Sequence, residues 1–586
     1  MSAFFDKCRT NKEIIFKLIV LVFISFICIN RINHLPSYPT GDGAEYVLVT
    51  EAFYKHKSPD IRPKDSWSFK KSFTKVLAWD SVYKPHVFDA FEGFITKPNK
   101  KFNEPGDSYG GLYVAKNGKI YGYHFFTYSL LNVPARYFVG LLHKNPLSAF
   151  KITNSIFVLI TCLILLFYTP FNLFISSLIA ISFYYSSVYW YIEWTHPEVF
   201  TACFVTASLW LFFQDKYYIS LLLMAIATTQ NQPLILMLFF MGIITLFHKG
   251  LNYKTIIKTG MCCILSILPP LFYFYHFETF SIIKKAGFLD SQYQTPTRIF
   301  GFYFDVNQGM ILAIPVVLIC YIAFWIKNIY ITVRQKQTVT FHVFLPLVLI
   351  AITFTVSAMG NWNHGQAVIN RYATWVSSII LVHFFFLLNT TKPITKTILI
   401  SLIAISQIFT AEYHSKINNT DLSWYQHKPF AKWVLSNYPA LYNPDPTIFG
   451  TRTSPNFNIL PNISPVIFFD EKKEACKIMC HITKVEELSI FGISQKTIEY
   501  FKKEKKVING WIYVNKGDYT SGYPTEKIHY LASYLKAKRI IIPKIKEDAS
   551  WYKHVKDNAK VLNISEDSSL MIDALYVLNL EDRDNN

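Results

Sequence analysis

Two carboxylates stand close to the end of an apolar run near the start of this chain. Asp42 and Glu45 lie in the segment SYPTGDGAEYVLVTEAFY (residues 37–54), shortly after an apolar run that ends near Ile29. If a helix begins at Gly43, their i, i+3 spacing places both carboxylates on one face, with Asp42 at the N-cap. A carboxylate placed there can act as a general base toward a hydroxyl group. The simpler interpretation is that Asp42 only caps a juxtamembrane helix.

A second acidic residue occupies a similar position later in the chain. His196 and Glu198 lie in WTHPEVF, directly before another apolar run, and Pro197 suits the first turn of a helix. Glu198 could simply complement the positive end of that helix. The alternative is that the fold brings Glu198 opposite Asp42 as a second acidic group.

Basic and polar residues mark three further positions. Arg371 opens an apolar run at the end of GNWNHGQAVINRY, where Trp362, His364 and Tyr372 accompany it. A guanidinium group holds phosphate through paired donors, although arginine also anchors helices at the membrane surface. Asp305 leads with Gly309 into an apolar run, and Lys84 in YKPH is a possible phosphate contact.

Motifs for other chemistry are absent from the sequence. It contains no P-loop, no GxGxxG fingerprint, no HExxH helix and no GxSxG nucleophile elbow. CKIMCH has an unusual spacing for zinc and lacks a second pair of ligands, so we predict no metal site. Cys476 and Cys480 are the one pair that could form a disulfide, because six of the nine cysteines lie in apolar runs.

The composition indicates a polytopic helical membrane protein. The chain has 586 residues, of which 51% are hydrophobic and 17% charged, whereas soluble chains carry about 25% charged residues. Apolar stretches of spanning length recur from Leu18 to Thr410. The net charge of +19 comes largely from basic residues in short inter-helix loops, as the positive-inside rule predicts, so nucleic-acid binding is not expected.

The charge pattern also predicts sidedness and four regions. A basic N-terminal tail places the N-terminus in the cytoplasm, and about 11–13 crossings follow. Hydropathy marks 12 segments, an even number that does not suit a C-terminus on the outside, and the segment 124–142 with Pro134 is the weakest. The predicted regions are a tail and first span (1–30), a long outer loop (31–123), a multi-span domain (124–412) and an outer α/β domain (413–586). In the last, SPVIFF, GWIYV, RIIIP and AKVLNI are predicted strands, and EKIHYLASYLKAK a helix.

The order of these motifs resembles the GT-C superfamily of membrane glycosyltransferases, which includes protein O-mannosyltransferases and the lipid A aminoarabinose transferase. The resemblance rests on a short first span, GDGAEY opening a long outer loop, many spans, and an outer C-terminal domain. DVNQG and W-N-H-G…N-R-Y further resemble the D-x-x-x-G and W-x-x-G…R-Y patterns of a bacterial subgroup. In this chain Gly43 and Ala44 separate the two acids, which such enzymes often carry side by side.

The resemblance implies a bacterial inner-membrane enzyme that transfers a sugar from a polyprenyl-phosphate-linked donor to a glycan, lipid or protein acceptor on the periplasmic face. Asp42 would be the base, with Glu45 and Glu198 as further catalytic acids. Arg371, with Lys84 or Arg136, would hold the donor phosphate; Lys119 is another candidate for that first-loop cation. His196, Asp305, Trp362, His364 and Tyr372 would contact substrate. No cofactor is required, although a divalent metal is possible.

Two other classes of function remain open from the sequence alone. A transporter or flippase for lipid-linked glycans would need polar residues along a path through the spans, and few are present. A non-catalytic membrane scaffold would use the C-terminal domain to bind partners. Replacing Asp42 by asparagine distinguishes these alternatives. An enzyme should lose sugar transfer while still inserting and binding lipid, whereas a flippase or a scaffold should be almost unaffected.

Overall fold

The structure is a computed structural model, and it describes residues 11–34, 42–67, 93–95, 108–334, 341–360, 362, 368–417, 426–454, 465–503, 508, 510–517, 531 and 533–584. Lys84 and His364 therefore lie outside the described residues. The chain divides into two compact units, the first comprising residues 1–360 and 364–421, and the second residues 361–363 and 422–586. Each unit is described separately.

The first unit is helical, and seven of its described helical segments are long and apolar enough to cross a membrane. They are Ile14–Ile32, Ser148–Phe167, Gln232–Lys249, Tyr253–Phe277, Pro315–Arg334, Arg371–Leu388 and Pro393–Ser415. Four shorter apolar helices accompany them: Leu173–Tyr184, Glu198–Phe212, Tyr217–Gln230 and Phe341–Val356. By length and composition the chain is a polytopic helical membrane protein, while the total of 11–13 crossings remains a prediction.

The weakest predicted segment, 124–142, forms the helix α6 (Thr127–Leu141) with Pro134 inside it. It has 15 residues and is not among the seven described helical segments of spanning length. Pro134 lacks the amide hydrogen that an internal helical residue normally donates, so it weakens the ladder of the helix at that point. Whether α6 crosses the membrane, and hence the parity of the crossings, stays a matter of prediction.

Two helices form the centre of the first unit. α19 (Arg371–Leu388) is buried along nearly all of its length, and α10 (Glu198–Phe212) is buried at 14 of its 15 residues. They pack against each other, and α10 also packs against α7 (Ser148–Phe167) and α11 (Tyr217–Gln230). A helix that is apolar on all sides favours such an enclosed position. The first residue of each central helix, Glu198 and Arg371, is charged.

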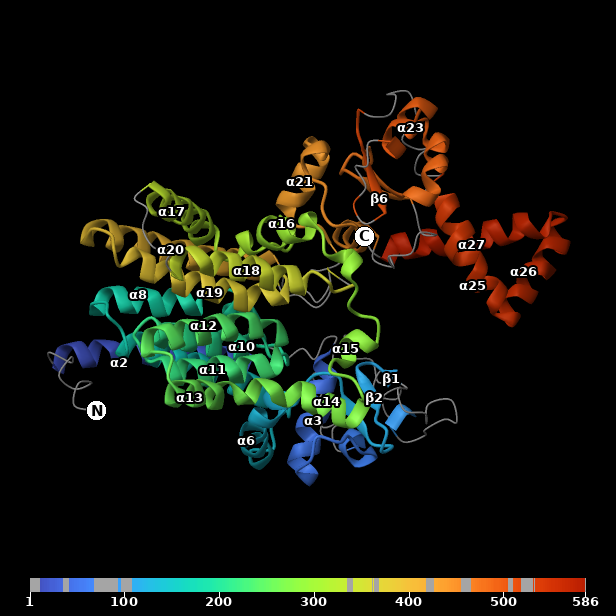
Figure 1. Cartoon of the computed structure of the whole chain (residues 1–586). Helices are drawn as coiled ribbons and strands as arrows, with labels where there is room; N and C mark the ends of the chain where they lie inside the picture. Colours follow the sequence, from blue (N-terminus) through green and yellow to red (C-terminus); the bar gives the residue numbers. More distant parts are fainter. Residues whose placement is uncertain are drawn as a thin grey trace. The chain divides into compact units, whose positions relative to one another are not determined.

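A small assembly of helices and strands gathers at one end of these helices (Figure 1). α3 (Gly43–His56) packs against α6 and is buried from Gly43 to Phe53. Beside it lies an antiparallel sheet of β1 (Ser108–Tyr109), β2 (Leu112–Val114) and β3 (Ile120–Gly122). An isolated bridge from Ile61 to Ile120 ties the chain after α3 to β3. The described residues of the segment 42–123, predicted as a long outer loop, thus build a packed layer.

The helix α14 (Leu268–Phe277) closes this layer on one side. The Tyr273 hydroxyl donates to the backbone oxygen of Tyr123 at 2.8 Å, and the amide of Lys116 donates to the backbone oxygen of His276 at 3.1 Å. These two bonds fix the β2–β3 hairpin against α14. The position of Tyr123 and His124, which follow β3, therefore depends on this contact.

The second unit contains an antiparallel sheet of β4 (Val466–Phe469), β5 (Ala475–His481) and β6 (Trp511–Asn515). The strands predicted in SPVIFF and GWIYV are confirmed, and the described part of EKIHYLASYLKAK is helical. Two strand predictions are wrong. RIIIP lies in the helical segments Ala537–Ile541 and α25 (Ile542–Glu547), and most of AKVLNI belongs to α26 (Ala549–Leu562).

The error in those two segments has a physical cause. A short apolar run has no periodicity of its own, and tertiary packing decides between helix and strand. Ile541, Ile545 and Val555 pack with residues of α27 (Glu566–Asp584) into a helical core. Cys476 and Cys480, the possible disulfide pair, are both free thiols on β5.

Candidate active site

The structure brings Asp42 and Arg371 together, although 329 positions separate them. Nη1 of Arg371 donates to Oδ2 of Asp42 at 2.6 Å, and the Tyr123 hydroxyl donates to Oδ1. Both charged side chains are largely buried, with exposed fractions of 8% for Arg371 and 13% for Asp42. Nη2 of Arg371 donates to the Tyr372 hydroxyl at 3.0 Å. An acid, a guanidinium and two phenols therefore share one enclosed position.

Asp42 does more than cap a helix. It directly precedes α3, as its spacing predicts, and its backbone oxygen accepts from the amides of Glu45 and Tyr46. Its side chain, however, makes no capping hydrogen bond and turns to Arg371 and Tyr123 instead. A capping role would use the carboxylate on the first free amides of the helix. The interpretation of Asp42 as only a cap is therefore wrong.

The start of α19 is held by the loop that contains Asp305. The side chain of Asn370 caps α19, and the backbone amide of Asn370 donates to the backbone oxygen of Gln308 at 2.9 Å. Oδ1 of Asp305 accepts from the amides of Asn307 and Gln308 at 2.8 and 3.0 Å. Asp305 shapes a turn that holds the residue before Arg371, so its described contacts support a positioning role. Its predicted contact with substrate stays a prediction.

Gly309 closes this turn, and we expect alanine there to destabilise the fold. An added Cβ would lie 2.4 Å from the amide nitrogen and 2.5 Å from the backbone oxygen of Asp305, neither of which can move freely. Overpacking of this kind costs about 1–3 kcal/mol. Thermal unfolding of Gly309→Ala should therefore occur at a lower temperature than that of the unmodified protein.

The matched control is Gly301→Ala in α16 (Pro296–Phe304), where the nearest atom to an added Cβ is 3.8 Å away. Alanine there removes a helical glycine and should leave stability unchanged or raise it by about 0.5–1 kcal/mol. Equal unfolding temperatures for the two variants would contradict the role given to the turn.

Glu45 faces a histidine that the sequence did not single out. Oε1 of Glu45 accepts from the amide of His124 at 2.8 Å, and Oε2 lies 3.0 Å from Nδ1 of the same residue. Burial lowers the pKa of His124, but the Glu45 carboxylate outweighs it and raises that pKa above its usual value. Burial also raises the pKa of Glu45, and the opposing effect of His124 does not cancel it. The pair is enclosed. A Cβ at Gly122 would lie 2.2 Å from Oε1 of Glu45, so only glycine leaves room for it.

His196, Glu198 and Tyr46 complete the cluster. The ring of Tyr46 stacks on that of His124, with 5.0 Å between centroids, and lies 5.7 Å from the ring of His196. Glu198 is 3% exposed, and its Oε2 has no hydrogen-bond partner among the described residues. A buried carboxylate oxygen without a partner is costly, and such groups occur where a ligand or a proton is to be bound.

Charge interactions set the protonation of Asp42. Burial raises the pKa of this carboxyl group, but Arg371, with smaller contributions from His124 and His196, holds it well below its usual range. Asp42 is therefore ionised at neutral pH. It is also a weak base for as long as Arg371 remains its partner, because a low pKa reduces proton affinity.

The other predicted phosphate ligands have partners elsewhere or are not described. Nε and Nη2 of Arg136 donate to the two oxygens of Glu51, inside the contact between α3 and α6. Nζ of Lys119 lies 3.9 Å from Oδ1 of Asp60. Lys84 lies outside the described residues, as does His364, while Trp362 is buried and belongs to the second unit. Of the predicted phosphate ligands that the structure describes, Arg371 is the one that contacts Asp42.

The pairing of Arg136 with Glu51 carries a stability prediction. Both side chains are buried, with 6% and 1% exposed, so Arg136→Met leaves a carboxylate uncompensated. Removing one partner of a buried pair costs about 3–5 kcal/mol. We expect a lower unfolding temperature for Arg136→Met and its recovery in the double variant Arg136→Met with Glu51→Leu. A single variant as stable as the parent protein would contradict a structural role for this pair.

The residues that the sequence missed share one property. Tyr123 and His124 follow a three-residue strand, and Tyr46 is an ordinary aromatic position in α3. Tyr123 and His124 lie in no motif, and Tyr46, the last residue of GDGAEY, is one of many aromatic residues in the chain, so no local signal marks them as site residues. Among the described residues, no group of three or more histidine, cysteine, aspartate or glutamate side chains is arranged to hold a metal ion.

Comparison with known proteins gives little that is specific. No family model matches the sequence, and no curated protein matches it. Among solved structures, the fold is similar to the archaeal oligosaccharyltransferase AglB from Archaeoglobus fulgidus, solved with an inhibitory peptide and a dolichol-phosphate, at a TM-score of 0.35 and 10% identity. That similarity covers 72% of this chain and 58% of the archaeal one.

Proposed function

We propose that the protein is a membrane glycosyltransferase that moves a sugar from a polyprenyl-phosphate-linked donor to a hydroxyl group of a glycan, lipid or protein acceptor. The observation that carries the proposal is the buried contact between Asp42 and Arg371, at the point where α19 begins. It joins a group able to accept a proton with a group able to hold a phosphate. Arg371 is also the first residue of a segment of spanning length, and we propose that the phosphate of a lipid carrier reaches it at that end of the helix.

The reaction needs few participants. The bond between the sugar C1 and the phosphate oxygen breaks, and its electron pair leaves with the polyprenyl phosphate. A bond forms between C1 and the acceptor oxygen, whose proton passes to Asp42. Arg371 stabilises the charge that develops on the leaving phosphate. No step requires a cofactor, and a divalent ion, where present, would act on the same phosphate.

The ion pair in the free protein gives this reaction an order. A donor phosphate competes with the Asp42 carboxylate for the guanidinium of Arg371, because both groups accept the paired donors of arginine. When the phosphate takes the guanidinium, Asp42 loses the charge that holds its pKa low and becomes a stronger base. The base would then be activated only when a donor is bound, which would limit futile hydrolysis.

The remaining assignments follow from the resemblance of the motifs. We assign Glu45, with His124, a supporting role toward the base from the first turn of α3, and we assign the unpartnered oxygen of Glu198 to contact with the acceptor or receipt of its proton. The proposed location is a bacterial inner membrane, with the N-terminus in the cytoplasm and both the site and the C-terminal domain in the periplasm.

Mass spectrometry of cell-surface glycans and lipids, with and without the gene, tests this function. The proposal predicts a sugar substituent that disappears with the gene and returns with the unmodified protein but not with Asp42→Asn. If the protein were a flippase or a scaffold, the unmodified protein and Asp42→Asn would restore the glycan and lipid profile equally. An unchanged glycan and lipid profile in the host would contradict the proposal.

A further inference from the structure

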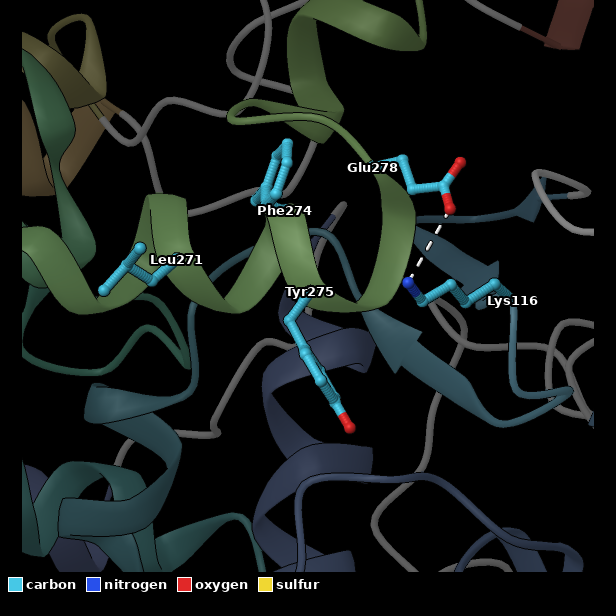
Figure 2. Close-up of a pocket in the computed structure, with 5 residues that line it drawn as sticks. All are labelled: Lys116, Leu271, Phe274, Tyr275 and Glu278. Carbon is cyan, nitrogen blue, oxygen red and sulfur yellow. Dashed lines mark ion pairs between the residues drawn. The ribbon is translucent and has the colours of Figure 1, made fainter.

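A pocket of about 640 Å³ lies against α14, and the proposed reaction does not use it. It is lined by Lys116, Leu271, Phe274, Tyr275 and Glu278 (Figure 2). Lys116 comes from the turn between β2 and β3, and the other four residues come from α14 and its C-cap. A volume of this size falls within the range of small-molecule sites.

The apolar wall of the pocket belongs to a segment of spanning length. Leu271, Phe274 and Tyr275 lie within Tyr253–Phe277, and their exposed fractions are 54%, 50% and 68%. Apolar side chains this exposed on a membrane-spanning segment face lipid chains. The pocket lies at the end of that segment, where α14 gives way to Glu278, and the end of a spanning helix is where lipid headgroups are expected.

The polar end of the pocket carries one charge of each sign. Nζ of Lys116 lies 3.6 Å from Oε1 of Glu278, and the charged ends of the two side chains point toward each other (Figure 2). They are 50% and 73% exposed, so their mutual attraction is weak and either can exchange its partner at little cost. Nζ of Lys116 also lies 5.7 Å from the ring centroid of Tyr275, whose face attracts cations.

We propose that this pocket binds a zwitterionic phospholipid, with Lys116 holding the phosphate, Glu278 and Tyr275 holding the ammonium group, and the apolar wall holding an acyl chain. Charge complementarity selects the occupant. An anionic headgroup would meet the carboxylate of Glu278 as well as Lys116, whereas a phosphoethanolamine or phosphocholine headgroup offers a partner to both. Binding of such a lipid does not depend on the proposed enzymatic function.

A lipid bound in this pocket would lie beside the contact between α14 and the β2–β3 hairpin. The amide of Lys116 bonds to the backbone of His276, and Tyr273 on the same helix bonds to the backbone of Tyr123. A lipid that bridges Lys116 and α14 would reinforce the contact that fixes the β2–β3 hairpin, and with it Tyr123 and His124. Occupancy should therefore raise the thermal stability of the first unit.

The test uses full-length protein in nanodiscs made from equal parts of phosphatidylethanolamine and phosphatidylglycerol, with native mass spectrometry of the lipids that stay bound. We expect phosphatidylethanolamine to be enriched about fivefold among retained lipids, the discrimination that one surface charge provides. The decisive variant is the charge swap Lys116→Glu with Glu278→Lys. It keeps the ion pair but reverses its polarity, so in the proposed orientation the phosphate and the ammonium group would each meet a side chain of like charge.

The swap should therefore abolish the enrichment and leave the ion pair intact. The matched control is the swap of Glu474 and Lys516, an exposed ion pair in the second unit, which should leave the enrichment unchanged. Even if the swap fails to fold, Glu278→Gln should reduce the enrichment, and Lys116→Gln should reduce the retention of both lipids, because both carry the phosphate. Equal retention of the two lipids by the unmodified protein, enrichment that survives the swap or Glu278→Gln, or unchanged lipid retention in Lys116→Gln would overturn the inference.

Discussion

Asparagine in place of Asp42 is expected to lower the rate of sugar transfer by about 10²–10⁴-fold, the contribution of a positioned general base. The amide keeps the size of the side chain and an oxygen that can accept from Arg371 and Tyr123, but it cannot take up the acceptor proton. Transfer of sugar to the acceptor, measured in reconstituted membranes, checks this result. Donor binding should persist, because Arg371 is then free of its carboxylate partner.

The control for Asp42→Asn is Asp290→Asn, which changes an exposed aspartate that caps a short helical turn. That variant should transfer sugar at the rate of the parent protein. Unfolding temperatures of both variants separate a chemical effect from a loss of fold. Full transfer activity in a correctly folded Asp42→Asn protein would show that Asp42 is not the base, and Glu198 would be the next carboxylate to test.

Glutamine in place of Arg371 is expected to produce a loss of about 10²–10³-fold in kcat, the effect of removing one donor to a developing oxyanion. Lysine should restore part of the loss, because it supplies charge without the paired donors of the guanidinium. The KM for the donor should rise in both variants. Arg62→Gln is a suitable control, since Arg62 is exposed and pairs with Asp60 away from the cluster.

The same variant should alter the dependence of activity on pH. A base must be ionised to act, so activity falls as the pH drops through its pKa. Arg371 holds the pKa of Asp42 well below its usual range, and without the guanidinium the burial of Asp42 raises it. The acid limb of kcat/KM should therefore shift to higher pH in Arg371→Gln. An identical profile in the two proteins would mean that Arg371 does not control Asp42.

The sequence located several members of the cluster but not their arrangement. Asp42, Glu198 and Arg371 stand at the beginnings of helices, and that position made each of them noticeable. Their mutual contacts depend on how α3, α10 and α19 pack, and no spacing along the chain encodes a contact across 329 positions. The shared face predicted for Asp42 and Glu45 also divides in the structure, because Asp42 turns to Arg371 and Glu45 to His124.

The amino-acid composition predicted more of the fold than of the candidate site. Long apolar runs predicted most helices of the first unit, because burial in lipid or in a helical core requires that composition. The same reasoning failed for RIIIP and AKVLNI, which are short enough to suit either a strand or a helix and were decided by packing against α27. Arg136, assigned to phosphate from its sequence position, instead pairs with Glu51, a partner that only the packing of α3 on α6 supplies.

The role of Asp42 in removing a sugar from a polyprenyl phosphate can be tested directly in cells. The measurement is mass spectrometry of the polyprenyl phosphate pool, in cells that produce either the unmodified protein or Asp42→Asn at equal levels, and it applies whichever sugar the carrier holds. We predict that sugar-loaded polyprenyl phosphate accumulates in Asp42→Asn cells while the free carrier declines. Identical pools in the two strains, with both proteins folded in the membrane, would contradict this role.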